Sequence, residues 1–177
     1  NVYGGELTVY EKNLSDGTNP NTPALTKNGT FTVTALDGLQ TLDVGGIHVV
    51  AGGVTAGFPQ TIVTALGNTL TITGYDSTTG VISYRSILVD NEAHPTSAGA
   101  NSLTENFDVV ATDTDGSTAS GQINVNIVDD LPTAAPNTAS ALEGTTVNIS
   151  VLGNDVLGAD GPAVSGAVIG VRAGSNT

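Results

Sequence analysis

The stretch Gln122-Ile123-Asn124-Val125-Asn126-Ile127-Val128 decides the fold of this chain, because its apolar residues alternate with polar ones. Alternation with a period of two is typical of a β-strand that buries one face and exposes the other. The stretch runs directly into Asp129-Asp130-Leu131-Pro132. Pro132 has no backbone N–H to donate to a neighbouring strand and favours an extended exit, so we predict that the strand ends here.

Runs of the same kind recur along the chain and are separated by Gly, Asn and Asp. No window of helical length shows a capped apolar period of 3.6 residues, so we expect almost no helix. The dipeptide Gly45-Gly46 suits a two-residue hairpin turn, because both glycines tolerate a positive φ. Many short strands with such turns predict an all-β fold, an antiparallel β-sandwich. We predict strands within 6–11, 30–35, 41–44, 47–50, 69–73, 81–89, 107–111 and 122–128.

The chain is long enough for one whole domain and part of another. We place the sandwich at residues 1–131 and an acidic, proline-containing linker at 132–137. Residues 138–177 are then the N-terminal part of a second, similar domain, with a new start at Ala141–Val147. Glu11 and Glu143 stand near the start of each unit and about 130 residues apart, a spacing that suits a repeated sandwich.

The charge of the chain limits its partners. It has 17 acidic and 4 basic residues, a formal net charge of −13 and no cysteine. This charge argues against binding to nucleic acid and to anionic membrane surfaces, and it favours cations. No apolar run approaches the roughly 20 residues of a membrane helix, so we expect no membrane insertion. The alternative for the charge alone is an acidic surface in solvent.

Six stretches of the chain share a further feature, and they are 10–18, 70–76, 80–84, 89–91, 113–120 and 128–134. In this order they resemble the repeat domains of giant RTX adhesins that bacteria export by type I secretion. The resemblance implies an Ig-like or cadherin-like sandwich, calcium at the joints between domains, and a secreted location on the bacterial cell surface. One departure is Ser117, where the family often has a second Asp after the Gly of an Asp-x-Asp-Gly turn. A further stretch, 151–161, resembles the start of a cadherin-like bacterial repeat.

Adjacent carboxylates at a strand end repel each other, and a cation between them relieves the repulsion. Calcium takes six to eight oxygen ligands, mainly from carboxylates, carbonyls and water. In a sandwich of this topology, we expect the first strand end, the turn after Val89 and the chain exit to share one end of the domain. The alternative for each residue is an ordinary polar turn in solvent. The predicted calcium ligands are Glu11, Asp90, Asp129 and Asp130, with Glu143, Asp155 and Asp160 from the next domain, and Asp113 and Asp115 facing the preceding domain.

We expect the chain not to be an enzyme. Only His48 and His94 could act as a general base near neutral pH. His48 is expected to be packed or at the surface of a strand, and His94 to lie in a solvated loop. The chain has no Gly-x-Ser-x-Gly motif of hydrolases and no glycine-rich loop that precedes a helix.

The resemblance to RTX adhesin repeats implies the predicted function, a calcium-stiffened extender of a large adhesin. As a monomeric repeat bound to its neighbours in the same chain, it would project a distant ligand-binding region for adhesion and biofilm formation. The alternative is an adhesion module that itself binds a carbohydrate or a protein. Aromatic residues, which such sites commonly expose, make up only 4% of the chain.

Overall fold

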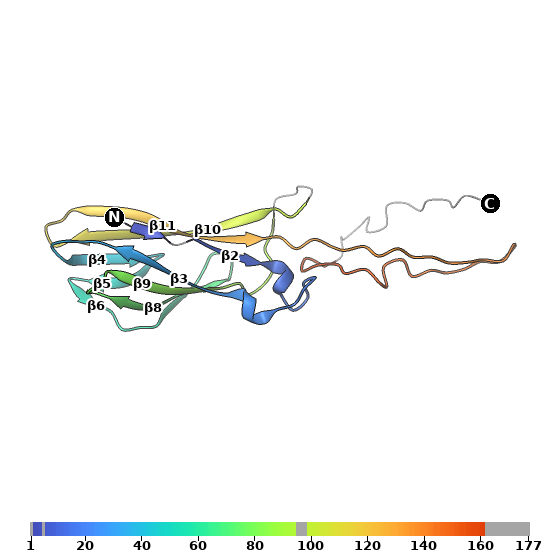
Figure 1. Cartoon of the computed structure of the whole chain (residues 1–177), viewed down its shortest axis with the longest axis horizontal. Coiled ribbons are helices and arrows are strands. Elements are labelled where there is room, and N and C mark those ends of the chain that lie inside the picture. The colour runs from blue at the N-terminus through green and yellow to red at the C-terminus, as the bar shows by residue number, and fades with distance from the viewer. Residues whose placement is uncertain (1, 5, 95–98, 162–177) are drawn as a thin grey trace.

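The computed structural model describes residues 2–4, 6–94 and 99–161, and it shows two β-sheets that pack face to face (Figure 1). The five-stranded sheet has the order β1 (Val2–Gly4), β3 (Thr26–Val33), β9 (Val81–Ile87), β8 (Thr69–Asp76) and β7 (Gln60–Val63). The six-stranded sheet has the order β2 (Glu6–Tyr10), β11 (Thr118–Val128), β10 (Ser102–Asp113), β4 (Leu39–Val44), β5 (Ile47–Ala51) and β6 (Val54–Thr55). The predicted all-β fold is confirmed.

Helical structure within the described ranges is limited to two single turns of 3₁₀-helix, η1 (Glu11–Asn13) and η2 (Thr22–Leu25). Neither is long or apolar enough to cross a membrane. The Gly45-Gly46 turn joins β4 to β5, as predicted. Its glycines have φ values of 55° and 90°, which a side chain at either position would strain.

The core lies between the sheets and follows the alternation in the sequence. Ile123, Val125 and Ile127 on β11 are at most 1% exposed, and they face the other sheet. The opposite sheet contributes Phe31 and Tyr84, whose ring centroids are 6.0 Å apart in a tilted arrangement. Every second side chain of these strands therefore points between the sheets. The sheets are held together because burying these side chains removes apolar area from water.

One strand pair differs from the antiparallel prediction. β2 pairs with β11 in parallel, with Tyr10 opposite Val128, whereas β1 pairs with β3 in the other sheet. The N-terminal segment therefore passes from the edge of one sheet to the edge of the other. Because parallel strands point the same way, the residues that come after β2 and β11 emerge at the same end of the sandwich (Figure 1).

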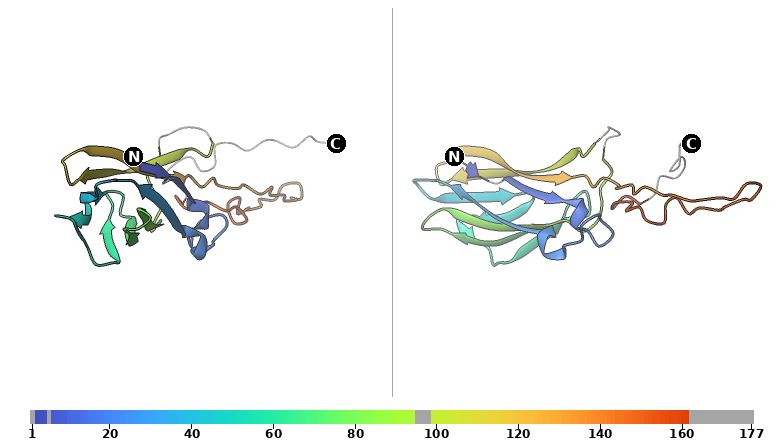
Figure 2. Two further views of the ribbon diagram at one scale, coloured as in Figure 1. Left: turned by 60° about the vertical axis from the view of Figure 1, so that its left-hand side comes forward. Right: turned by 45° about the vertical axis from the view of Figure 1, so that its right-hand side comes forward.

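Beyond that end, residues 131–161 make a long, narrow excursion and return to the sandwich (Figures 1 and 2). Its described part has no strand ladder beyond an isolated bridge between Thr133 and Val156. It exposes Leu142, Val147 and Ile149, so within this chain it buries little apolar surface of its own. Residues 162–177 of the predicted second domain lie outside the described ranges.

Candidate metal centre

Glu11 is a fully buried carboxylate at the end of β2. Val9, two residues earlier, faces the core and is 1% exposed, and Glu11 continues this inward phase at 0%. Its Oε1 accepts a 2.6 Å hydrogen bond from the backbone N–H of Glu92. Its Oε2 is also buried and has no hydrogen-bond partner. A buried carboxylate oxygen without a donor is costly, so the geometry invites a positive ligand.

Asp129 comes next to Glu11 because of the strand register. Since Tyr10 lies opposite Val128 in a parallel pair, the two residues directly after them are neighbours. The backbone N–H of Asp129 donates to the carbonyl of Asn101 at 3.0 Å, which fixes the chain as it leaves β11. Its Oδ1 is buried without a hydrogen-bond partner, as Glu11 Oε2 is.

His94 is the third member of the group, and the expectation of a solvated side chain was wrong. Its side chain is only 4% exposed. The Nδ1 atom lies 2.8 Å from Oδ1 of Asn101, and Nε2 lies 3.1 Å from Oε1 of Glu11. The second distance is within ion-pair range, yet the alignment does not make a hydrogen bond, and Nε2 remains without one. No local pattern marks His94, because its burial depends on contacts with residues far along the chain.

Glu11, His94 and Asp129 each offer one ligand atom, and these atoms lie within 4.8 Å of one another. Two ionised carboxylates at such a distance repel by roughly 3 kcal/mol at an effective dielectric of about 20. Burial raises the pKa of Glu11 above its usual value, although the Glu92 N–H and His94 act in the opposite direction. Asp160 adds to the rise through its charge. A bound cation would remove the repulsion and compensate the buried charge.

Asp130 has a different role from Asp129. It is 6% exposed, and its Oδ2 accepts backbone N–H groups of Thr18 at 2.7 Å and of Ala159 at 3.1 Å. Its Oδ1 accepts the Thr18 hydroxyl at 2.5 Å. Gly158, with a φ of 81°, lets the returning chain approach Asp130 closely. Asp130 thus holds the turn after η1 and the returning segment together without needing a cation.

Asp90 and Asp160 lie at the exposed rim of this end. The side-chain amide of Asn91 donates to Oδ1 of Asp160 at 2.9 Å, which ties the returning segment to the turn after β9. Oδ1 of Asp90 accepts the N–H of Asn91 at 2.9 Å. The structure thus brings Glu11, Asp129, Asp130 and Asp160 to one end, with Asp90 beside them.

A second buried acidic group adjoins the first. The amide of Asn68 donates to Glu92 at 2.7 Å and to Glu105 at 3.3 Å, and all three residues are buried. Burial raises the pKa of Glu92, and the charges of Glu105 and Glu11 raise it further. Neither acid was predicted from the sequence as part of a site. Glu105 stands in the inward phase of β10 with Phe107 and Val109, and this alternation could have identified it.

Four predicted ligands lie away from this cluster. Asp113 and Asp115 form the turn between β10 and β11, where Thr114 contacts Asp37 and Gly38 at the opposite end of the sandwich. Glu143 is exposed in the turn between Leu142 and Thr145. Asp155 accepts the N–H of Ala135 at 2.7 Å within the excursion.

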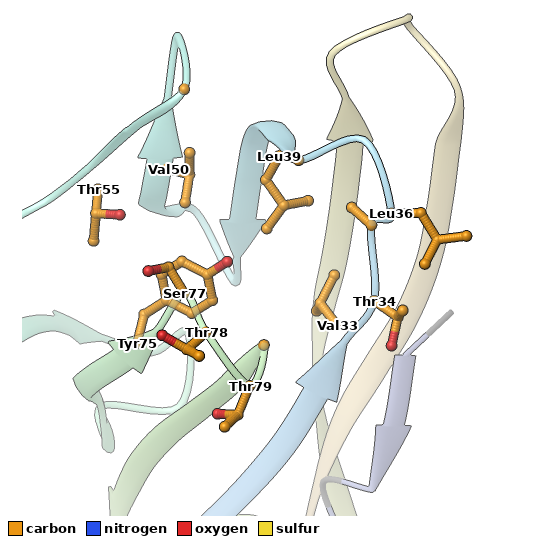
Figure 3. A pocket seen from close by; sticks show the side chains of 14 residues that line it. Val33, Thr34, Leu36, Leu39, Val50, Thr55, Tyr75, Ser77, Thr78 and Thr79 are labelled. Atoms are coloured by element: carbon orange, nitrogen blue, oxygen red, sulfur yellow. The ribbon is translucent and has the colours of Figure 1, made fainter.

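The opposite end also has a hollow of 390 Å³ between the two sheets (Figure 3). Its lining includes Leu39 and Val50 from one sheet and Tyr75 from the other, with the hydroxyls of Ser77 and Thr78 at its rim. Burial raises the pKa of Tyr75, with a smaller contribution from the charge of Asp76. An apolar floor beside hydroxyl groups can accept a small polar molecule with an apolar face.

Comparisons of the chain with protein-family models, with curated proteins and with solved structures find no match. The site must therefore be interpreted from its own chemistry. The unpartnered oxygens of Glu11 and Asp129 fit a divalent cation such as calcium. The nitrogen of His94 is not a donor that calcium prefers.

Proposed function

We propose that this chain is an extender repeat of a large bacterial surface adhesin, with an Ig-like or cadherin-like sandwich that calcium stiffens at its C-terminal end. The observation that carries the proposal is the position of the unpartnered carboxylates. Glu11 and Asp129 lie where the chain leaves the sandwich, and Asp160 of the returning segment acts on Glu11 through its charge. A cation bound there would join the sandwich to the segment that continues beyond it.

Stiffness at this point matters for an extender, because a flexible joint would let the array collapse. The stretch 131–137 contains two prolines among small residues, and alone it permits a range of angles. Asp130 limits that range through Ala159, and Asn91 limits it through Asp160. Calcium held by Glu11 and Asp129 would add a contact that depends on the ion.

The wider chemistry agrees with a surface location. The chain has no cysteine and therefore no disulfide, and its net charge of −13 favours cations. Extracellular calcium sites commonly have dissociation constants of ~10⁻⁴–10⁻³ M, which suits ions in the medium. The resemblance to repeats of RTX adhesins supports the same assignment.

The test is the shape of two repeats in tandem, each covering residues 1–137, measured by small-angle X-ray scattering. We expect a larger maximum dimension and lower flexibility in millimolar calcium than in chelator. The matched control is the tandem carrying Glu11→Gln in both copies, which should stay in the compact or variable state. Equal dimensions of the unmodified tandem in both conditions would contradict stiffening by calcium.

A ligand-binding adhesion module is the second candidate, and the hollow at the opposite end favours it. Tyr75 and the hydroxyls of Ser77 and Thr78 provide a stacking surface beside polar groups, as carbohydrate sites do (Figure 3). A glycan array separates the two functions, since a pure extender should bind nothing. Binding that Tyr75→Ala abolishes would favour the module.

A further inference from the structure

His94 is held as a metal-binding histidine is held. Oδ1 of Asn101, 2.8 Å from Nδ1, is a carbonyl oxygen and can only accept a hydrogen bond, so Nδ1 carries the hydrogen. In the neutral ring Nε2 then carries a lone pair. Metal-binding histidines commonly donate their other ring N–H to a carbonyl in this way, which fixes the ring and its tautomer.

Nε2 of His94 lies among other acceptor atoms. Nε2 lies 3.1 Å from Oε1 of Glu11, and His94 and Glu11 each offer a ligand atom to one group that Asp129 completes. Nε2, Glu11 Oε2 and Asp129 Oδ1 are all buried, and none of them has a hydrogen-bond partner. Three acceptors that converge without a donor repel one another, and a cation among them reverses the interaction.

Asn101 supports two members of this group at once. Its side-chain oxygen is bonded to His94, and its backbone carbonyl accepts the N–H of Asp129. One residue thus fixes both a nitrogen and an oxygen donor, while the Glu92 N–H fixes Glu11. The three donors come from segments far apart in the sequence but are each oriented by a backbone or amide contact.

The donor set distinguishes between classes of cation. Calcium and magnesium are hard ions that take oxygen ligands, whereas imidazole nitrogen suits zinc and other first-row transition ions. Zinc accepts His nitrogen and Asp or Glu oxygen as ligands, and in its open sites three protein ligands leave a fourth position for water. One imidazole and two carboxylates match that composition.

We propose that Glu11, His94 and Asp129 form a binding site for a divalent transition cation of the zinc type, and that His94 makes this site prefer zinc over calcium. The two ions compete for the same carboxylates, and the nitrogen decides between them. The proposal goes beyond the proposed function, in which calcium occupies the same carboxylates. The site itself needs only the sandwich and not the extender role.

The test uses the 177-residue chain without an affinity tag, titrated with Zn²⁺ and separately with Ca²⁺ by isothermal calorimetry. We expect one zinc site that is at least 100-fold tighter than calcium. In His94→Gln, zinc affinity should fall at least tenfold and calcium affinity should change less than threefold. The chain has only two histidines, so His48→Gln is a matched control. His48 is an exposed side chain that contacts Asp43, and its loss should leave zinc binding unchanged.

A second measurement needs no variant. Long-range ¹H–¹⁵N spectra of the histidine rings should show a hydrogen on Nδ1 of His94 before metal is added, and a shift of Nε2 when zinc binds. The ring of His48 should not change. Zinc binding that survives His94→Gln, that disappears in His48→Gln, or that leaves the His94 ring unshifted would overturn the proposal. An equal loss of calcium and zinc in His94→Gln would overturn the claimed preference.

The outcomes also separate this inference from the extender function. Zinc binding through His94, with no change of shape in the tandem repeat under either ion, would retain the site and reject the extender. Calcium-dependent extension without zinc binding at His94 would retain the extender and reject the site.

Discussion

The two ends of the sandwich use carboxylates in opposite ways. At the end opposite the candidate metal centre, Asp76 accepts hydrogen bonds from Thr78 and Thr79, and Asp115 accepts them from Ser117. The donors from Thr78 and Thr79 lower the pKa of Asp76. A side-chain hydrogen bond with Asp113, followed by the bonds from Ser117, lowers the pKa of Asp115. At the candidate metal centre, Glu11 is buried with one oxygen unpartnered, and burial raises its pKa.

The difference shows why the number of acidic residues does not locate a cation site. A carboxylate in a turn obtains its donors from the next few residues and remains in water, so it needs no ion. A carboxylate that a strand carries into the interior has only the donors that other segments bring to it. Substitutions at each end can therefore test this contrast.

The largest expected effect comes from Asp130→Ala. Asp130 and Asp76 each accept three hydrogen bonds, but those of Asp130 are partly or fully buried and join segments 29 and 112 residues apart, whereas those of Asp76 are exposed. Because hydrogen bonds to buried charged groups are the stronger ones, we expect Asp130→Ala to lower the free energy of unfolding by about 3 kcal/mol. Urea denaturation measures it. The matched change Asp76→Ala should lower the free energy of unfolding far less. Equal decreases in the two variants would contradict the difference between the two ends of the sandwich.

The second prediction concerns calcium. At ten times the dissociation constant, one bound ion stabilises the fold by ~1.4 kcal/mol. The melting temperature should therefore rise with millimolar calcium in the unmodified chain and in Asp115→Asn, but not in Glu11→Gln. In chelator, the melting temperature of Glu11→Gln should equal or exceed that of the unmodified chain, because the substitution removes an uncompensated buried charge. Calorimetry with and without calcium checks both. A calcium response that survives Glu11→Gln would place the ion elsewhere.

The third prediction is a pH dependence of opposite sign at the two ends. The pKa of Glu11 is raised from its ordinary value of 4.5, so its contribution to stability is present below pH 4.5 and is lost as pH rises through the raised pKa. The pKa of Asp76 is lowered from 3.8, so its contribution is present above pH 3.8 and is lost as pH falls through the lowered pKa.

Melting temperatures of metal-free protein between pH 3 and 7 test these signs. Glu11→Gln should reduce the fall in melting temperature as pH rises. Part of this fall should remain in the variant, because the pKa of Glu92 is also raised and acts with the same sign. Asp76→Asn should reduce only the fall in melting temperature as pH decreases. The same change of profile in both variants would show that the ends do not differ.

The smallest expected effect is that of Asp115→Asn. Its carboxylate is bonded to the N–H and hydroxyl of Ser117 within an exposed turn. We expect almost no change in melting temperature, since surface substitutions of this kind seldom matter. We also expect an unchanged calcium affinity. A clear loss of that affinity would show that the Asp113–Asp115 turn is a second ion site.

Much of the fold could be predicted from the sequence, because a half-buried strand must alternate. The alternation in 122–128 and the glycines at 45–46 predicted β11 and the turn between β4 and β5. The segments Val54–Thr55 and Gln60–Val63 were not predicted as strands. They are short, and their valines are exposed, Val54 at 70% and Val63 at 72%. Their apolar residues therefore do not mark a buried face of a strand.

The candidate site could be predicted only in part. The sequence by itself determined that carboxylates stand at the ends of β2 and β11, since the strand pattern stops at Glu11 and Asp129. Only the tertiary structure decided that they meet, because the parallel pairing of β2 with β11 is set by which sheet edge the N-terminal segment reaches. It also decided that His94 joins them, because this loop residue is buried in part by its contact with Glu11, which lies far earlier in the chain and leaves no period in the local sequence.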